Sequence, residues 1–199
     1  FKAQSEGDRN EATETERPGN WVELVRGSKP MVAAVNGAAI GVGLTQILPF
    51  DYIIGGPTAK FSARFIKMGL VPELASSYFI AARTGFGQAN RLMLTGETID
   101  SHRALQIGLI DESVETEAEL VERGLELAQL MGDNPQKALR MVKSLVTQNL
   151  AETDLKKIQH RELTALHACY ESPEHKEAID AFINKRAPDF KAARSSGPG

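Results

Sequence analysis

Cysteine is nearly absent from this chain, which has one, Cys169, among its 199 residues. A single cysteine excludes an intramolecular disulfide framework and any metal site built from several cysteines. Long hydrophobic runs are also absent, since no stretch approaches the roughly 18 apolar residues of a membrane-spanning helix. Basic residues are not in excess, and the net charge of −3 argues against a general nucleic-acid binder.

The hydrophobic content of 42% is enough for one domain with a buried core and an appended part. We find neither a secretory signal pattern nor a C-terminal peroxisomal motif. Without these signals, we expect a cytoplasmic protein, or a protein of an organelle matrix if the source is a eukaryote. The histidines lie in polar segments and form no metal-ligand set, so no metal is expected.

The pattern of apolar residues and turns divides the chain into three parts. Residues 1–20 are polar and predict a flexible segment, whereas residues 21–115 alternate short apolar runs, glycine-containing turns and one mainly helical stretch. Residues 116–199 are predominantly helical in pattern. Strands are expected at 31–35, 52–55, 60–62, 66–68 and 110–114. Helix is expected at 74–108, interrupted at glycines, and again from 116 onward, where the last helix is expected at 173–184. An α/β core followed by a helical region is predicted.

The most informative segment is KPMVAAVNGAAIGVG, residues 29–43, in which an apolar run ends at Asn36-Gly37 and two further glycines precede helix-compatible sequence. A strand that leads into a helix through glycines presents free backbone N–H groups at the positive end of the helix dipole. This arrangement suits a phosphate or the negative oxygen that develops on a reacting carbonyl. The segment has neither the Lys-Ser/Thr of a P-loop nor a G-x-G-x-x-G pattern. On its own it therefore leaves a purely structural turn open.

A second segment, FSARFIKMGLVPELASS at 61–77, carries one carboxylate, Glu73. An acid in the first turn of a helix can simply stabilise the helix dipole. The neighbours Leu70 and Leu74 are apolar, however, and apolar surroundings disfavour the charged form of a carboxylate and make it a better base. The serines that follow, Ser76 and Ser77, are expected to cap or pack the helix.

Four stretches together resemble the crotonase superfamily, which contains the enoyl-CoA hydratases and isomerases: KPMVAAVNGAAIGVGL, FSARFIKMGLVPELASSY, LMLTGETIDSHRALQIGLID and EAIDAFINKRAPDF. The resemblance implies an α/β fold in which β-β-α turns stack into a spiral core. It also implies that the N-terminal part of this core is absent from the present chain. A helical C-terminal region that mediates trimers, or hexamers made of two trimers, is implied to follow. It also implies an acyl-CoA thioester substrate, with coenzyme A as part of that substrate and no separate cofactor. From the net charge and the short apolar runs, no nucleic-acid or membrane partner is expected.

The shared chemistry of this family is stabilisation of a thioester enolate by two backbone N–H groups that form an oxyanion hole. Carried to this sequence, the resemblance implies that Val42 supplies the second N–H, at a position where the family usually has glycine. Other contacts with the acyl-CoA are expected from Ile40, Gly41, Phe65, Leu70 and Lys185. Lys185 matches a family position that can reach the nucleotide part of coenzyme A, sometimes across a subunit boundary.

The acidic residues separate the reactions of the family. Hydratases use two carboxylates to activate water, and the corresponding positions here are Thr45 and Phe65, neither of which can do so. Glu73 falls where Δ3,Δ2-enoyl-CoA isomerase-like members carry their catalytic carboxylate. One carboxylate can remove a proton from C2 and deliver one to C4, so an isomerase is predicted. Hydratase or other crotonase chemistry, and a non-catalytic acyl-CoA-binding or assembly module, remain alternatives.

Members of the family have about another half-domain ahead of the segment that matches Phe1. It includes the loop that supplies the first oxyanion N–H and cradles much of the coenzyme A. The resemblance therefore implies that these 199 residues alone catalyse poorly. The expected function is that of the intact protein, and acyl chain length and pathway stay open.

Overall fold

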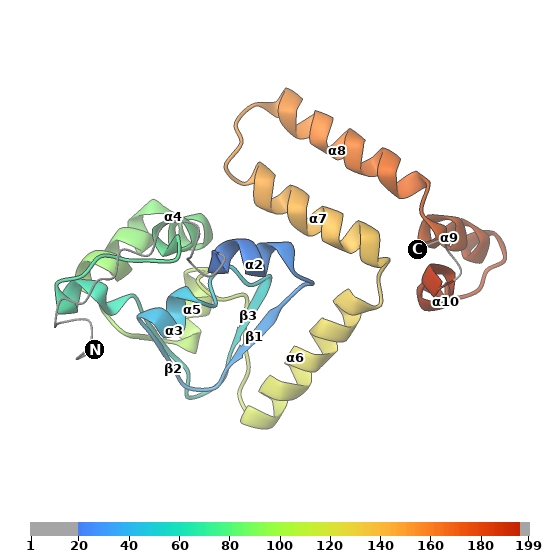
Figure 1. Ribbon diagram of the computed structural model, residues 1–199. Coiled ribbons are helices and arrows are strands. Elements are labelled where there is room, and N and C mark those ends of the chain that lie inside the picture. The colour runs from blue at the N-terminus through green and yellow to red at the C-terminus, as the bar shows by residue number, and fades with distance from the viewer. Residues whose placement is uncertain (1–19, 196–199) are drawn as a thin grey trace, which may run out of the picture.

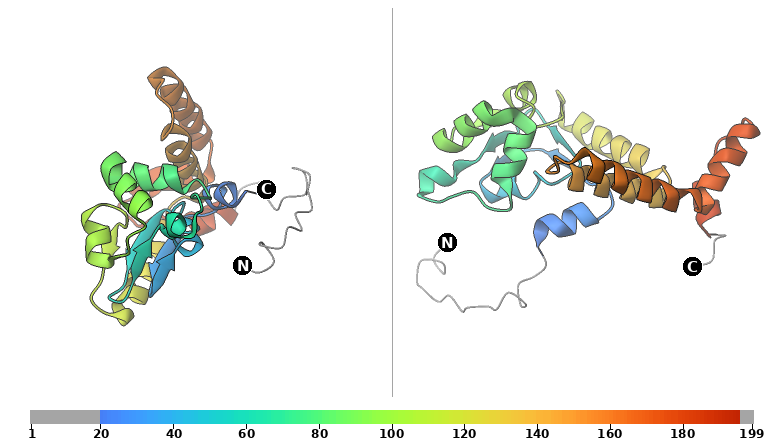
Figure 2. Two further views of the ribbon diagram at one scale, coloured as in Figure 1. Left: turned by 90° about the vertical axis from the view of Figure 1, so that its left-hand side faces the viewer. Right: turned by 90° about the horizontal axis from the view of Figure 1, so that it is seen from above.

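The computed structural model describes residues 20–195, which form an α/β core and a helical arm that projects from it (Figures 1 and 2). One sheet has the order β1-β3-β6 with all neighbours parallel, and the other has the order β2-β4-β5. In the second sheet β2 and β4 are parallel, whereas β4 and β5 are antiparallel. The strands are β1 (Val32–Val35), β2 (Ala38–Ile40), β3 (Tyr52–Gly55), β4 (Lys60–Ser62), β5 (Ile99–Asp100) and β6 (Glu112–Ser113).

The strands β1 to β4 alternate between the two sheets, and this alternation gives the core its spiral course. Val32 of β1 pairs with Tyr52 of β3, and Ala38 of β2 pairs with Lys60 of β4. The β1-β2 unit therefore lies beside the β3-β4 unit, one turn further along the chain. The predicted α/β spiral core with a helical C-terminal region is confirmed.

The helices begin largely where the sequence places their start signals. Asp100 accepts a hydrogen bond from the Arg103 N–H at 2.9 Å, and Asp154 accepts one from the Lys156 N–H at 2.9 Å, as N-cap side chains do. The helices are α2 (Trp21–Gly27), α3 (Val42–Thr45), α4 (Ser76–Thr95), α5 (Ser101–Gln106), α6 (Glu117–Gly132), α7 (Gln136–Asn149), α8 (Leu155–Tyr170), α9 (Pro173–Ile183) and α10 (Phe190–Ser195).

Three expectations about the elements are wrong. The strand expected at 66–68 is part of a 3₁₀ helix, η2 (Arg64–Met68), which ends at the left-handed Gly69. The strand β2 lies inside the glycine-containing loop, where only a turn was expected, and α10 follows the helix expected to be the last. The predicted flexible segment, apart from its last residue, falls outside the described residues.

The core lies between the two sheets and the helices α3, α4 and α5. Its largest fully buried side chains include Leu44, Leu48, Ile53, Phe61 and Ile80. A smaller cluster under α6 joins Ile54, Val114, Leu120 and Leu127. In β3 the successive residues Ile53, Ile54 and Gly55 are all buried, which explains why its sequence is a continuous apolar run and not an alternating pattern.

The arm consists of α7, α8, α9 and α10 (Figure 1). Specific contacts join the helices of the arm. The buried Glu174 carboxylate of α9 accepts a hydrogen bond from the Gln136 N–H at 2.8 Å and so caps α7. Large apolar side chains nonetheless stay exposed along the arm, among them Val142, Leu163 and Phe182. In residues 20–195, no helix is long and apolar enough to cross a membrane.

A partly buried group of charges joins the arm to the core. Asp51 binds Arg26 of α2 at 3.0 Å and Lys143 of α7 at 2.7 Å, and it accepts the Met31 N–H at 2.8 Å. The Lys143 side chain is 3% exposed. Burial lowers the pKa of Lys143, and its hydrogen bond to Asp51 opposes that shift. One carboxylate thus holds α2, α7 and the segment before β1 in place.

We expect Asp51→Ala to lower the free energy of unfolding by about 3–5 kcal/mol, because it leaves the buried Lys143 ammonium without its counter-charge. Urea denaturation measures this change. Glu126→Ala is the control, since Glu126 is 64% exposed in its pair with Arg123, and surface pairs contribute little. Equal effects of the two substitutions would contradict this role for Asp51.

Gly41 makes the turn between β2 and α3 possible. Its φ of 57° and ψ of −120° lie in a region that other residues avoid. A Cβ atom at Gly41 would meet nothing within 4 Å, so the requirement for glycine comes from the backbone and not from a lack of space. The turn that starts α3 therefore depends on this residue.

We expect Gly41→Ala to destabilise the protein by about 1–3 kcal/mol, the usual cost of a strained backbone conformation. Gly43→Ala is the matched control. A Cβ at Gly43 has only the Ala38 carbonyl oxygen near it, at 3.8 Å, and Gly43 lies within α3, where alanine is favourable. Thermal unfolding of both variants tests this difference, and a Gly41→Ala variant as stable as Gly43→Ala would contradict it.

Candidate active site

The loop between β2 and α3 presents a free backbone donor. Gly41 donates its N–H to the Ser62 carbonyl oxygen at 2.9 Å, which attaches the loop to the end of β4. The next N–H, of Val42, begins α3 and has no hydrogen-bond acceptor within the described part of the chain. The Val42 side chain is 53% exposed, so Val42 does not serve to pack the helix. An N–H in this position can donate to an oxygen that carries negative charge.

The sheet brings the second predicted segment to the same edge. Ile40, the last residue of β2, pairs with Ser62, the last residue of β4. Because β2 and β4 are parallel, the segments that follow them leave the sheet at the same end. The loop at 41–45 and the segment at 63–75, with η2 and Glu73, therefore start side by side.

The Glu73 side chain is exposed, so the expectation that apolar neighbours bury it is wrong for this chain. Leu70 is 52% exposed and Val71 is 81% exposed, because the loop leaves the core after η2 and the described residues place nothing over it. In residues 20–195, no side chain forms an ion pair with Glu73. The carboxylate is thus accessible to a molecule that lies on this face.

A tight turn follows Glu73 and leads into α4. The Ser76 N–H donates to the Glu73 carbonyl oxygen at 3.0 Å, and the two central residues are left-handed, Leu74 with φ 52° and Ala75 with φ 55°. Two positive φ angles define a type I′ turn, which glycine, asparagine and aspartate usually form. For leucine and alanine each such angle costs about 1–2 kcal/mol. The sequence offers no signal for this turn, because neither residue favours it.

The positions that correspond to hydratase carboxylates lie in different surroundings. Thr45 is fully buried in α3, and its hydroxyl donates to the Val42 carbonyl oxygen at 3.4 Å. Phe65 is half-buried in η2. A threonine turned into the core and a phenylalanine offer no base to a water molecule.

Lys185 is far from the other predicted site residues within one chain. It follows α9 in a left-handed conformation, with φ 51°. Figure 1 shows α9 at the opposite end of the molecule from α3 and α4. The structure therefore brings the loop with Ile40, Gly41 and Val42 and the start of the segment that carries Phe65, Leu70 and Glu73 to one edge of the second sheet. Lys185 lies outside this grouping.

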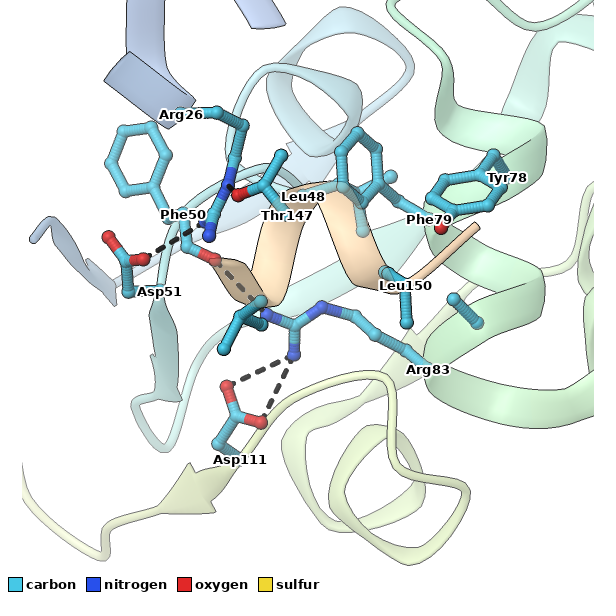
Figure 3. Close-up of a pocket in the computed structure, with 12 residues that line it drawn as sticks. Arg26, Leu48, Phe50, Asp51, Tyr78, Phe79, Arg83, Asp111, Thr147 and Leu150 are labelled. Carbon is cyan, nitrogen blue, oxygen red and sulfur yellow. Dashed lines mark hydrogen bonds and ion pairs between the residues drawn. The ribbon is translucent and has the colours of Figure 1, made fainter. Parts of the chain in front are cut away.

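A separate pocket lies between α4, α7 and the segments that lead into β3 and β6 (Figure 3), with a volume of about 350 Å³. Arg26 and Arg83 lie on its wall, each paired with an aspartate: Arg83 binds Asp111 at 3.0 Å. Asp111 also accepts the Ile53 N–H at 2.8 Å. None of the predicted site residues lines this pocket, and its charged groups serve to join helices to strands.

Comparison with known proteins gives a consistent result. A model of the enoyl-CoA hydratase/isomerase family matches residues 2–193. The chain is 34% identical over 177 residues to 2,3-dehydroadipyl-CoA hydratase of Escherichia coli, covering 88% of this chain and 68% of that protein. It is 33% identical over 164 residues to an enoyl-CoA hydratase of Alternaria alternata, covering 82% of this chain and 55% of the relative. A third relative, 1,2-epoxyphenylacetyl-CoA isomerase of Escherichia coli, is 31% identical over 170 residues, 84% of this chain and 63% of its own length.

Solved structures agree with this result. The enoyl-CoA hydratase of Bacillus anthracis superposes with a TM-score of 0.81 at 26% identity, over 85% of this chain and 66% of its own. The enoyl-CoA hydratase/isomerase of Cupriavidus metallidurans gives 0.77 at 30% identity, over 86% and 63%. The chain thus spans between about half and two thirds of the length of these relatives. From the family match and the shared crotonase fold, we conclude that the chain belongs to the enoyl-CoA hydratase/isomerase family.

Proposed function

We propose that the intact protein is a Δ3,Δ2-enoyl-CoA isomerase, which moves a double bond of an acyl-CoA thioester from the 3- to the 2-position. One observation carries this proposal. The segment beside the Val42 loop presents a single accessible carboxylate, Glu73, whereas the two positions of the hydratase carboxylates hold Thr45 and Phe65. A reaction that needs one carboxylate and no activated water matches this set of residues.

In the proposed reaction the thioester oxygen accepts a hydrogen bond from the Val42 N–H. Glu73 takes a proton from C2, and the electron pair delocalises over the thioester and the double bond as a dienolate. The charge on its oxygen is stabilised by the donor, and one such donor contributes a factor of roughly 10²–10³ in rate. The protonated Glu73 then delivers the proton to C4, which leaves the double bond between C2 and C3.

The neighbouring residues would bind the acyl group. Ile40 and Gly41 precede the donor, Phe65 is the half-buried residue of the otherwise exposed η2, and Leu70 is exposed three residues before Glu73. An apolar wall beside the carboxylate would exclude water from the dienolate. Such exclusion strengthens the hydrogen bond from Val42, because the surrounding dielectric falls.

Hydration is the second candidate, because most of the relatives described above are named hydratases. It would require a base for water that neither Thr45 nor Phe65 supplies. Other crotonase chemistry and a non-catalytic acyl-CoA-binding module are further candidates, and the accessible Glu73 argues against the latter. The cytoplasmic location and the lack of a separate cofactor or metal stay predictions.

The test is an assay of the whole encoded protein with 3-enoyl-CoA and 2-enoyl-CoA substrates. We expect isomerisation of the former and a fall in kcat of about 10²–10⁴-fold in Glu73→Gln, because the amide cannot transfer the proton. Glu122→Gln, at another exposed glutamate, should leave kcat unchanged. Addition of water by the wild type, or undiminished isomerisation by Glu73→Gln, would refute the proposal.

We also propose that residues 116–199 assemble the protein into a homotrimer or a hexamer of two trimers. The support is the exposed apolar surface of the arm, where Phe182 is 83% exposed and Ile183 is 69% exposed. Lys185 follows directly in the chain, remote from its own Val42 loop (Figure 1). In an assembly it could contact the nucleotide of an acyl-CoA bound to a neighbouring copy, as a point charge toward phosphate.

Phe182→Asp is expected to reduce the assembly to smaller species, because it places a charge in the apolar contact. Light scattering after size-exclusion chromatography measures the mass, and thermal unfolding shows whether the chain stays folded. Phe86→Asp is the matched control. Phe86 is similarly exposed, at 82%, but it lies in α4, which belongs to the α/β part of the molecule and not to the arm. An unchanged mass for Phe182→Asp would contradict an interface at α9.

A further inference from the structure

The start of α4 departs from the pattern that five other helix starts follow. Its N-cap residue, Ala75, provides no side-chain acceptor, and Ala75 and Leu74 both have positive φ angles. Five other helices begin with a side chain that caps the backbone, from Asn20, Asp100, Thr116, Asp154 and Ser172. The departure directly follows Glu73.

The first residue of α4 adds a third departure. Ser76 is 1% exposed, and its hydroxyl is the one buried side-chain polar atom in residues 20–195 that has no hydrogen-bond partner. The expectation that Ser76 packs is confirmed, but Ser76 does not cap the helix. A buried hydroxyl without a partner destabilises a protein, and alanine would fill this position without that cost.

Packing explains why residue 76 is buried, but it does not explain why this residue carries a hydroxyl. Ile80, one helical turn further along α4, is fully buried and anchors the helix on the core. Any small side chain at position 76 would allow that contact. Departures from local rules that have no local compensation are expected at functional sites, and here three of them lie within three residues of the proposed catalytic carboxylate.

The turn holds Ser76 close to Glu73. A turn closed by a hydrogen bond from its fourth N–H to its first carbonyl oxygen, here 3.0 Å long, keeps the two Cα atoms within about 7 Å. A glutamate side chain can reach a serine hydroxyl over that separation. The strained pair Leu74–Ala75 therefore sets the relative position of the carboxylate and the hydroxyl.

We propose that Ser76 is a positioning residue, whose hydroxyl donates a hydrogen bond to the Glu73 carboxylate when a bound acyl-CoA covers that carboxylate. This proposal rests on the proposed isomerase function. Glu73 is exposed, so water can satisfy its oxygens. A thioester that covers the carboxylate displaces this water. The Ser76 hydroxyl then holds one carboxylate oxygen and leaves the other directed at the C2 proton.

Ser76→Ala in the whole encoded protein tests this role with a 3-enoyl-CoA substrate. We expect kcat to fall about 10- to 100-fold, the range for a hydrogen bond to a charged group. KM should stay within about twofold, because the contact forms with Glu73 and not with the substrate. Tm should be unchanged or higher, because the variant removes an unpaired buried hydroxyl.

Ser77→Ala is the matched control, since Ser77 is the next residue of α4 and is exposed, and its kcat should equal that of the wild type. Glu73→Gln distinguishes the two proposals: full activity in that variant refutes the isomerase mechanism itself. Loss of activity in Glu73→Gln with wild-type kcat in Ser76→Ala overturns only the positioning role. A fall in Tm with a parallel loss of kcat in Ser76→Ala would show a structural role and also overturn it.

Discussion

The parallel pairing of β2 with β4 is the constraint on which the candidate site depends. It places Ile40 opposite Ser62, so the Val42 loop and the segment that carries Glu73 leave one sheet at the same edge. The loop is fastened there by the bond from the Gly41 N–H to the Ser62 carbonyl oxygen. The proposed joint action of Val42 and Glu73 on one thioester depends on this pairing, because about thirty residues separate them in the sequence.

The charged contacts of the core have a different task from the charged group at the site. Asp51 and Asp111 each accept a backbone N–H and bind an arginine, so they hold helices against the strands. Glu73 has no such partner in the region that the structure describes. The role proposed for this carboxylate, at the start of a strained turn, is therefore in catalysis and not in these stabilising contacts.

Local sequence predicted much of the fold. The strands Tyr52–Gly55 and Lys60–Ser62 lie where they were predicted, because apolar runs bounded by turn residues identify buried strands. Asp100 and Asp154 are N-cap residue types, and each caps a helix start in the structure. The segment at 66–68 was mistaken for a strand, since apolar residues in one 3₁₀ turn give the same short pattern. The strand Ala38–Ile40 was missed, because small residues among glycines show no periodicity.

The sequence by itself determined the family and the residues of the candidate site: motifs in the right order singled out Val42 and Glu73 and showed that Thr45 and Phe65 cannot act as hydratase carboxylates. Only the tertiary structure decided that Glu73 is exposed, that Leu74 and Ala75 form a left-handed turn, and that Ser76 is buried without a partner. Exposure and backbone strain depend on what the rest of the chain packs around a residue. Neighbours in sequence do not supply that information.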